Sequence, residues 1–174
     1  MLTASDEHAT LRAPVLYVWL ESAPDPSMTS PEARTVRLDV ASRIELLDTI
    51  QVTLSHLAGL AGFDEEAVHY MSVAVRESVV NAIKHGNRQD ESKRVHLRFT
   101  IHDRALEIEV RDEGKGFDLA AVPDPLAPEN LLKAYGRGLF FMRQFMDEVT
   151  HSFPAKGGTV VRMLKRSYPE PPPS

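Results

Sequence analysis

The sequence predicts an α+β fold, a two-layer sandwich in which helices pack on one face of a mostly antiparallel mixed sheet. Segments with apolar residues at helical spacing alternate with segments in which apolar and polar residues alternate. Their expected order is strand, two helices, two strands, a loop, a helix and two strands, and such grouping favours α+β over a parallel α/β sheet. A length of 174 residues, 43% of them hydrophobic, suits one domain with a sizeable core.

The two ends of the chain differ in composition from the middle. Residues 1–34 are expected to be an N-terminal extension and linker, because prolines and serines interrupt them, and residues 167–174 form a proline-rich tail. The domain is therefore expected to span residues 35–166. Within the extension, residues 15–20 are either a short strand, a docking segment, or part of a loosely ordered tail.

The first half of the domain is expected to hold one strand and two helices. The strand lies near residues 35–40, and a helix over 43–58 follows, where Ser42 and Glu45 have the spacing of a capping box. A second helix over 64–84 begins at Asp64, a good N-cap. Its apolar stripe faces the core, and a mixed face carrying Glu77, Asn81 and Lys84 lies roughly opposite. A mixed second face indicates that something covers it, such as a ligand.

The second half of the domain is expected to hold two strand pairs and one helix. Residues 95–101 and 106–110 alternate and are connected through residues 102–104, which predicts a hairpin with one covered face. Residues 118–135 lose periodicity and contain three prolines. A helix over 137–146 follows, and strands near 148–153 and 159–164 are joined through Gly157 and Gly158.

Charge and composition exclude several classes of function. The formal net charge is −5 and no dense run of Lys or Arg occurs, so direct binding to nucleic acid or to an acidic membrane is not expected. Cysteine is absent, which excludes disulfides and thiolate metal sites. The apolar segment near residues 13–20 is too short to span a bilayer, and acidic residues precede it, so a cytoplasmic protein is expected.

Glu77 and Asn81 are the first candidate site residues. They are four residues apart and share a helix face. A carboxamide oxygen suits Mg²⁺, which also takes substrate phosphates, and a carboxylate one turn away can act as a general base. The alternative for this pair alone is a solvated helix face.

Two glycine motifs follow in the sequence. Asp112 ends a strand, and Gly114 and Gly116 follow two residues apart, so the backbone there can turn sharply and approach a flat ligand. The Asp112 carboxylate can accept a hydrogen bond from an exocyclic amine. Gly136, Arg137 and Gly138 are expected to open a helix directly, where free N–H groups and the helix dipole form an anion site. Each motif alone is equally compatible with a plain turn or a helix boundary.

Thr159, after the second glycine pair, could line a base pocket, although Gly157 to Thr159 first suggests a hairpin turn. His85 is either a helix-end residue or a ligand. The other histidines show no metal-ligand spacing, and no Ser-His-Asp set is evident.

Taken together, these residues resemble a known superfamily. Glu77, Asn81, Ala82, His85 and Gly86 resemble the N box of the gyrase, histidine kinase and MutL (GHKL) ATPases. The segment from Asp112 to Phe117 resembles the G1 box, and the segment from Gly136 to Leu139 resembles the G2 box. Within the superfamily, the sequence of the helix that carries the N box and the compact size of the chain are most similar to those of the anti-sigma factor serine/threonine kinases.

The resemblance implies a Bergerat-type, histidine-kinase-like ATPase domain that uses ATP and Mg²⁺. By analogy, Asn81 would hold Mg²⁺, Glu77 would be the catalytic base, Asp112 would bind adenine, and Arg137 would contact the terminal phosphate. Residues 118–135 would be the ATP lid. The nucleotide-binding candidates taken from the boxes and their surroundings are Asn81, Lys84, His85, Asp112, Gly114, Gly116, Phe117, Gly136, Arg137, Gly138, Leu139 and Thr159.

The resemblance also implies partners. Kinases of this family bind a sigma factor or phosphorylate a serine on a small anti-anti-sigma (STAS-type) protein, and they often act as homodimers. Two other functions stay open at the level of sequence. One is a non-catalytic binding module gated by ATP. The other is the detached catalytic domain of a histidine kinase, although His56 lacks the acidic neighbour and following proline expected of a phosphoacceptor.

Overall fold

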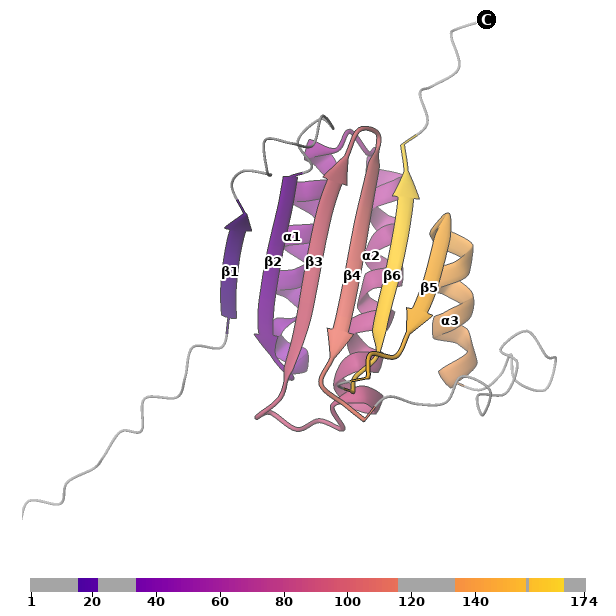
Figure 1. Cartoon of the computed structure of the whole chain (residues 1–174). Helices are drawn as coiled ribbons and strands as arrows, with labels where there is room; N and C mark the ends of the chain where they lie inside the picture. The colour runs from indigo at the N-terminus through magenta and orange to yellow at the C-terminus, as the bar shows by residue number, and fades with distance from the viewer. Residues whose placement is uncertain (1–15, 22–33, 116–133, 156, 168–174) are drawn as a thin grey trace, which may run out of the picture.

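The protein contains one six-stranded antiparallel sheet, shown in Figure 1. The structure is a computed structural model that describes residues 16–21, 34–115, 134–155 and 157–167. The strand order is β1-β2-β3-β4-β6-β5, and each neighbouring pair is antiparallel. The strands are β1 (Leu16–Glu21), β2 (Arg34–Ala41), β3 (Arg94–His102), β4 (Ala105–Asp112), β5 (Glu148–Ser152) and β6 (Val160–Arg166).

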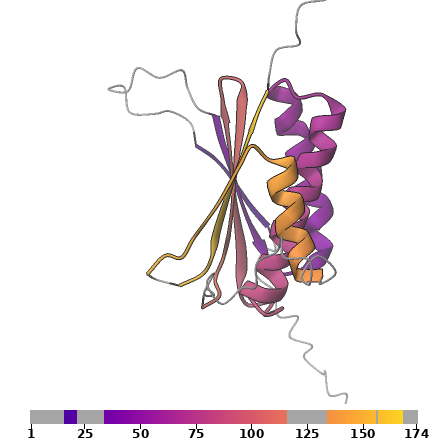
Figure 2. The same cartoon turned by 90° about the vertical axis from the view of Figure 1, so that its right-hand side faces the viewer.

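Helices cover one face of this sheet, as Figure 2 shows. They are α1 (Leu47–Leu60), α2 (Glu65–Asn81) and α3 (Ala134–Phe145). A 3₁₀ turn, η1 (Ile44–Leu46), precedes α1, and α2 continues into a π-helical turn, η2 (Ala82–Gly86). The core lies between the two layers and includes Leu54, Met71, Phe99, Ile108 and Met163, none with measurable exposure. The predicted α+β sandwich is confirmed.

The starts of the first two helices show one correct and one wrong sequence prediction. Asp64 caps α2, and its Oδ1 accepts from the backbone N–H of Ala67 at 2.7 Å. The capping box at Ser42 and Glu45 is wrong, because neither cap in this segment has a side-chain bond. Ser42 instead is buried at the end of β2, where its N–H donates to the carbonyl of Lys93 at 3.0 Å.

The strand predictions are largely confirmed. β3 and β4 form the expected hairpin, with Arg104 in the turn at φ 58°. The N-terminal segment is a strand: β1 pairs with β2 from Leu16 opposite Val40 to Glu21 opposite Thr35. The division of the chain into an extension (residues 1–34), a domain (35–166) and a tail (167–174) stays a prediction. Within the part of the chain that the structure describes, no helix is long and apolar enough to cross a membrane.

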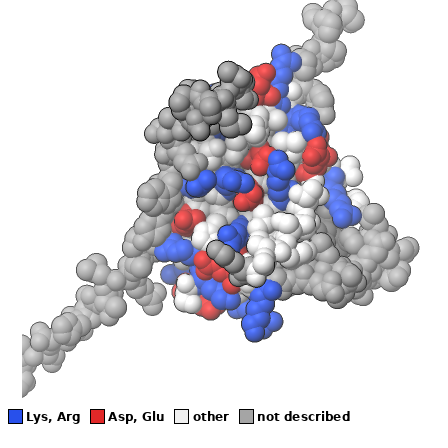
Figure 3. All heavy atoms as spheres, in the orientation of Figure 1, with Lys and Arg blue, Asp and Glu red and all other residues white. Residues whose placement is uncertain are grey.

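The other face of the sheet carries interspersed acidic and basic side chains (Figure 3). Arg98 pairs with Glu109 at 2.6 Å, and Arg162 pairs with Glu107. Burial opposes ionisation of Glu107, but the hydrogen bond and charge of Arg162 outweigh it, so the pKa of this carboxyl lies below its usual value. Because opposite charges are paired along adjacent strands, this face has a mixed charge rather than a basic patch.

Candidate functional site

A cavity lies between the end of α2, the ends of β4 and β6, and α3. It brings together four of the predicted site residues, Asn81, His85, Asp112 and Thr159. Glu77 and Lys84 are not among its lining residues. The lining also includes residues that the sequence did not single out as site residues: Ser78, Ala82, Gly86, Val110, Met142, His151 and Val161. The elements that carry these residues are far apart in sequence, and only the fold brings them together.

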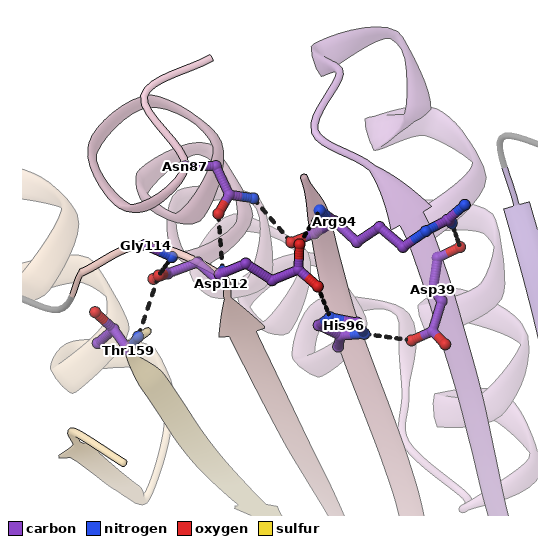
Figure 4. A network of polar contacts seen from close by, with 8 residues as sticks. Asp39, Asn87, Arg94, His96, Asp112, Gly114 and Thr159 are labelled. Atoms are coloured by element: carbon purple, nitrogen blue, oxygen red, sulfur yellow. Dashed lines mark hydrogen bonds and ion pairs between the residues drawn. The ribbon is translucent and has the colours of Figure 1, made fainter. Parts of the chain in front are cut away.

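Asp112 is the buried acidic group of this cavity, with 3% of its surface exposed. Its Oδ1 accepts from the N–H of Gly114 at 2.8 Å and from the N–H of Thr159 at 3.1 Å, as Figure 4 shows. The N–H of Asp112 donates to the carbonyl of Thr159 at 3.1 Å. These bonds fix the carboxylate against the start of β6, so it is positioned before any ligand arrives.

Three glycines pack around Asp112 at distances that exclude a side chain. A Cβ added at Gly86 would lie 2.3 Å from Cγ of Asp112, and one at Gly114 would lie 2.3 Å from the carbonyl oxygen of Gly86. At Gly158, where φ is +85°, it would lie 2.2 Å from the carbonyl oxygen of Asp112. Gly114 was predicted to approach a flat ligand. Its close contacts within the protein are with Gly86 and Asp112, so these glycines pack tightly around Asp112, and of the three Gly86 lines the cavity.

Asn87 joins the end of η2 to the start of β3 and to the residue that follows β4 (Figure 4). Its side chain has no exposed surface; Oδ1 accepts from the N–H of Glu113 and Nδ2 donates to the carbonyl of Arg94, both at 2.8 Å. Its own N–H donates to the carbonyl of Ala82, five residues back, at 2.7 Å. The predicted helix ends at residue 84, and the sequence assigned no role in the site to Asn87.

Polar contacts link Arg94 and His96 to Asp39 across the sheet (Figure 4), and this chain of contacts begins at the Glu113 carboxylate. Glu113 accepts from the N–H of Arg94 at 2.9 Å and lies 2.9 Å from Nε2 of His96, whose Nδ1 lies 2.7 Å from Asp39. Burial raises the pKa of Glu113, but the bonds from Arg94 and His96 outweigh it and hold the pKa below its usual value. The contacts therefore favour the ionised carboxylate beside Asp112.

Glu77 and Asn81 lie together beside the first half of α3. A Cβ added at Gly138 would lie 2.8 Å from Oε2 of Glu77 and 3.6 Å from Nδ2 of Asn81. Both side chains are half-buried, whereas Lys84 is exposed in η2. Part of the mixed face of α2 is thus covered by a helix, which sequence analysis did not foresee.

The predicted glycine motif in α3 is only partly described. The helix begins at Ala134, three residues before Arg137, so Gly136 lies inside its first turn. Gly138 is buried. The side chains of Arg137 and Leu139 lie outside the described residues. So do Gly116, Phe117 and residues 118–133 of the predicted lid.

His151 of β5 is a site residue that the sequence analysis missed. Burial and the nearby charge of Arg143 lower its pKa, so its imidazole is neutral at pH 7. Its alternation with exposed neighbours in β5 was the only available signal, and that pattern cannot show that β5 lies beside the cavity.

Comparison with known proteins identifies the family. The model of the histidine kinase-like ATPase domain matches residues 40–165, most of the described fold. The chain belongs to this family. It is 31% identical over 139 residues to the serine-protein kinase RsbW of Bacillus subtilis, covering 75% of this chain and 84% of the relative. The RsbW of Oceanobacillus iheyensis is 31% identical over 120 residues, covering 66% and 76%. The predicted resemblance to the anti-sigma factor kinases is confirmed.

The site of this histidine kinase-like ATPase fits the nucleotide that its family uses. The cavity has a fixed acceptor at Asp112, apolar walls, and the buried hydroxyls of Ser78 and Thr159, which have no hydrogen-bond partner in the described protein. Such an apolar slot with a few convergent polar groups suits a planar base. The oxygens of Glu77 and Asn81 are hard donors of the kind that Mg²⁺ prefers.

Proposed function

We propose that the protein is a Mg-ATP-dependent serine/threonine kinase that phosphorylates a small anti-anti-sigma (STAS-type) protein and binds a sigma factor. One observation carries the proposal: a buried, pre-positioned Asp112 lies in the same cavity as Asn81, with Glu77 one helical turn away against α3. The names of the relatives, serine-protein kinases, support it. The site has two ends. The base end comprises Gly86, Asp112, Gly114, Gly158 and Thr159, and the phosphate end comprises Glu77, Asn81 and Gly138.

At the base end, Asp112 accepts from the exocyclic amine of adenine and Thr159 lines the same wall. The N–H of Thr159 already donates to the Asp112 carboxylate and the N–H of Asp112 to the Thr159 carbonyl, so base binding requires little reorganisation of the protein. A base with a carbonyl at the amine position would face the Asp112 carboxylate with an acceptor, and the site would reject it.

At the phosphate end, Glu77 and Asn81 take separate roles. Asn81 would hold Mg²⁺, and the ion would offset the charge of the substrate phosphates. Glu77 accepts the proton that the substrate serine loses as its oxygen bonds to the terminal phosphorus and ADP leaves with the bonding electrons. Gly136, Arg137 and Gly138 would contact the phosphates. Transfer then depends on positioning and charge stabilisation.

The catalytic role is tested with Glu77→Gln, which keeps the shape of the side chain and removes its basicity. We expect ATP binding to change less than threefold and serine phosphorylation of a panel of small STAS-type proteins to fall by about 100-fold or more. The matched control is Glu65→Gln, an exposed residue in the first turn of the same helix. Phosphotransfer at the wild-type rate would remove Glu77 from the mechanism. Tight partner binding without any transfer by the wild type would favour an ATP-gated binding module.

The metal and assembly proposals have their own measurements. Calorimetry of ATP binding with and without Mg²⁺ should show a metal-dependent gain that Asn81→Ala removes. ATP affinity that is the same with and without Mg²⁺, and the same in Asn81→Ala, would contradict the role of Asn81.

We also propose a homodimer. Light scattering on the full chain should give the mass of a dimer, and the mass of a monomer would contradict this proposal.

A further inference from the structure

Two buried hydroxyl groups at the cavity have bonding capacity that the described protein does not use. Ser78 is 1% exposed and Thr159 is 3% exposed, and both residues line the cavity. Within the described chain, neither Oγ of Ser78 nor Oγ1 of Thr159 has a hydrogen-bond partner. A hydroxyl can donate one bond and accept two, and buried hydroxyls nearly always find a partner. A pair of such groups at one cavity therefore indicates a ligand with polar atoms at that place.

The position of Ser78 makes this absence unusual. A serine in a helix normally donates to the carbonyl one turn earlier, and the hydroxyl of Ser78 does not. The residue lies on the side of α2 that faces the cavity, and Ala82 and His85 of the following turn η2 line the same cavity. Val75 and Val79 belong to the core, so a serine at this position buries a polar atom where an alanine would pack without penalty.

The polar requirements of adenine divide between the groups at the cavity. Asp112, when ionised, can only accept, so it can serve the exocyclic amine but not the ring nitrogens, which are acceptors themselves. The described walls beside it are apolar at Ala82, Val110 and Val161. A donor is needed for a ring nitrogen, and the two free hydroxyls can provide it.

We infer that Ser78 is a base-contacting residue whose hydroxyl donates to a ring nitrogen of adenine, next to the contact that Asp112 makes. The inference rests on the proposed ATP-binding function and deepens it. Ser78 directly follows Glu77 in α2, so one helical turn carries both a contact to adenine and the proposed proton acceptor. Adenine bound through Ser78 thereby fixes the position of the turn that carries Glu77.

The test is a binding cycle with Ser78→Ala and a set of nucleotides. Calorimetry on the full chain compares ATP with 1-deaza-, 3-deaza- and 7-deaza-ATP, each lacking one ring nitrogen. We expect Ser78→Ala to weaken ATP binding about three- to tenfold, the effect of one hydrogen bond. With one of the three analogues, wild type and variant should bind equally, which identifies the nitrogen. Ser72→Ala, the same substitution elsewhere on α2, should bind all four nucleotides as the wild type does.

Thermal unfolding without nucleotide separates contact from structure. Because the alanine removes a buried unpaired hydroxyl, the Tm of Ser78→Ala should equal or exceed that of the wild type, while its ATP-induced rise in Tm should be smaller. Unchanged ATP affinity overturns the inference, and so does an equal loss with every analogue together with a lower Tm. Failure of the wild type to bind ATP would instead overturn the proposed function itself.

Discussion

The base end and the phosphate end of the site are built in different ways. At the base end, Gly114 and Gly158 pack backbone against backbone, and a Cβ at Gly158 would lie 2.2 Å from the carbonyl oxygen of Asp112. At the phosphate end, the corresponding contact of Gly138 is with the far end of a side chain, Oε2 of Glu77 at 2.8 Å. A carboxylate can rotate away and a carbonyl of a strand cannot. The base end is therefore rigid, and the phosphate end is adjustable.

The largest expected effect tests that rigidity through Gly158→Ala. The substitution places a Cβ against the backbone of Asp112 at a φ of +85°, so we expect a loss of about 2–4 kcal/mol in the free energy of unfolding. Denaturant unfolding measures it. Gly59→Ala is the control: nothing lies within 4 Å of its added Cβ, and a helical alanine should stabilise by about 0.5–1 kcal/mol. Equal stability of the two variants would contradict a rigid base end.

The next effect concerns the Asn87 clasp, the two side-chain hydrogen bonds by which Asn87 links η2 to Arg94 of β3 and to Glu113 after β4. Asn87→Ala leaves the N–H of Glu113 and the carbonyl of Arg94 without their buried partner, which should cost about 1–3 kcal/mol. Asn87→Asp keeps the acceptor but loses the donor, and its loss should also be measurable by denaturant midpoint. An alanine variant with the wild-type midpoint would show that the clasp adds no stability.

At the phosphate end, Gly138→Ala should separate stability from catalysis. The added Cβ displaces the Glu77 carboxylate, while alanine suits the helix, so we expect stability to change by less than about 1 kcal/mol. Phosphotransfer should fall by about tenfold or more because Glu77, the proposed general base, is misplaced. Single-turnover kinetics at saturating ATP measure this. Full activity would indicate that Glu77 adjusts without consequence.

The smallest effect is the pH dependence contributed by His151. Its pKa is lowered in the folded protein, so the unfolded chain binds the proton more readily and stability falls as pH drops below about 6.5. His151→Gln should flatten this decline between about pH 7 and pH 5.5 in denaturant midpoints. His69→Gln, at an exposed site on α2, is the matched control. A wild-type slope in His151→Gln would remove His151 from the pH response.

Local chemistry allowed much of this structure to be predicted from sequence. Asp64 caps α2 because the bond reaches only to Ala67, and the β3–β4 hairpin follows from alternation and a short connection. The capping box at Ser42 failed because a distant residue, Lys93, holds the backbone there.

The same distinction separates the predicted from the missed residues of the site. Asp112 and Asn81 could be proposed from the sequence because they belong to motifs that resemble a family. Ser78 lies in an apolar stripe and His151 in a short strand, and neither pattern shows that β5 and α3 meet α2. Asn87 was missed because its bonds reach Arg94 and Glu113, residues that only the fold brings close.

The π-helical turn at Ala82–Gly86 has a consequence for how this chain tolerates insertions and deletions. Its closing bond spans five residues, from Asn87 to Ala82, one more than in an α-helix. Each residue of a helix turns the chain by about 100°, so deleting one residue here would let α2 continue regularly but rotate Gly86 and Asn87 away from Asp112 and Glu113. The length of this segment is therefore constrained by the contacts that Gly86 and Asn87 make with Asp112 and Glu113.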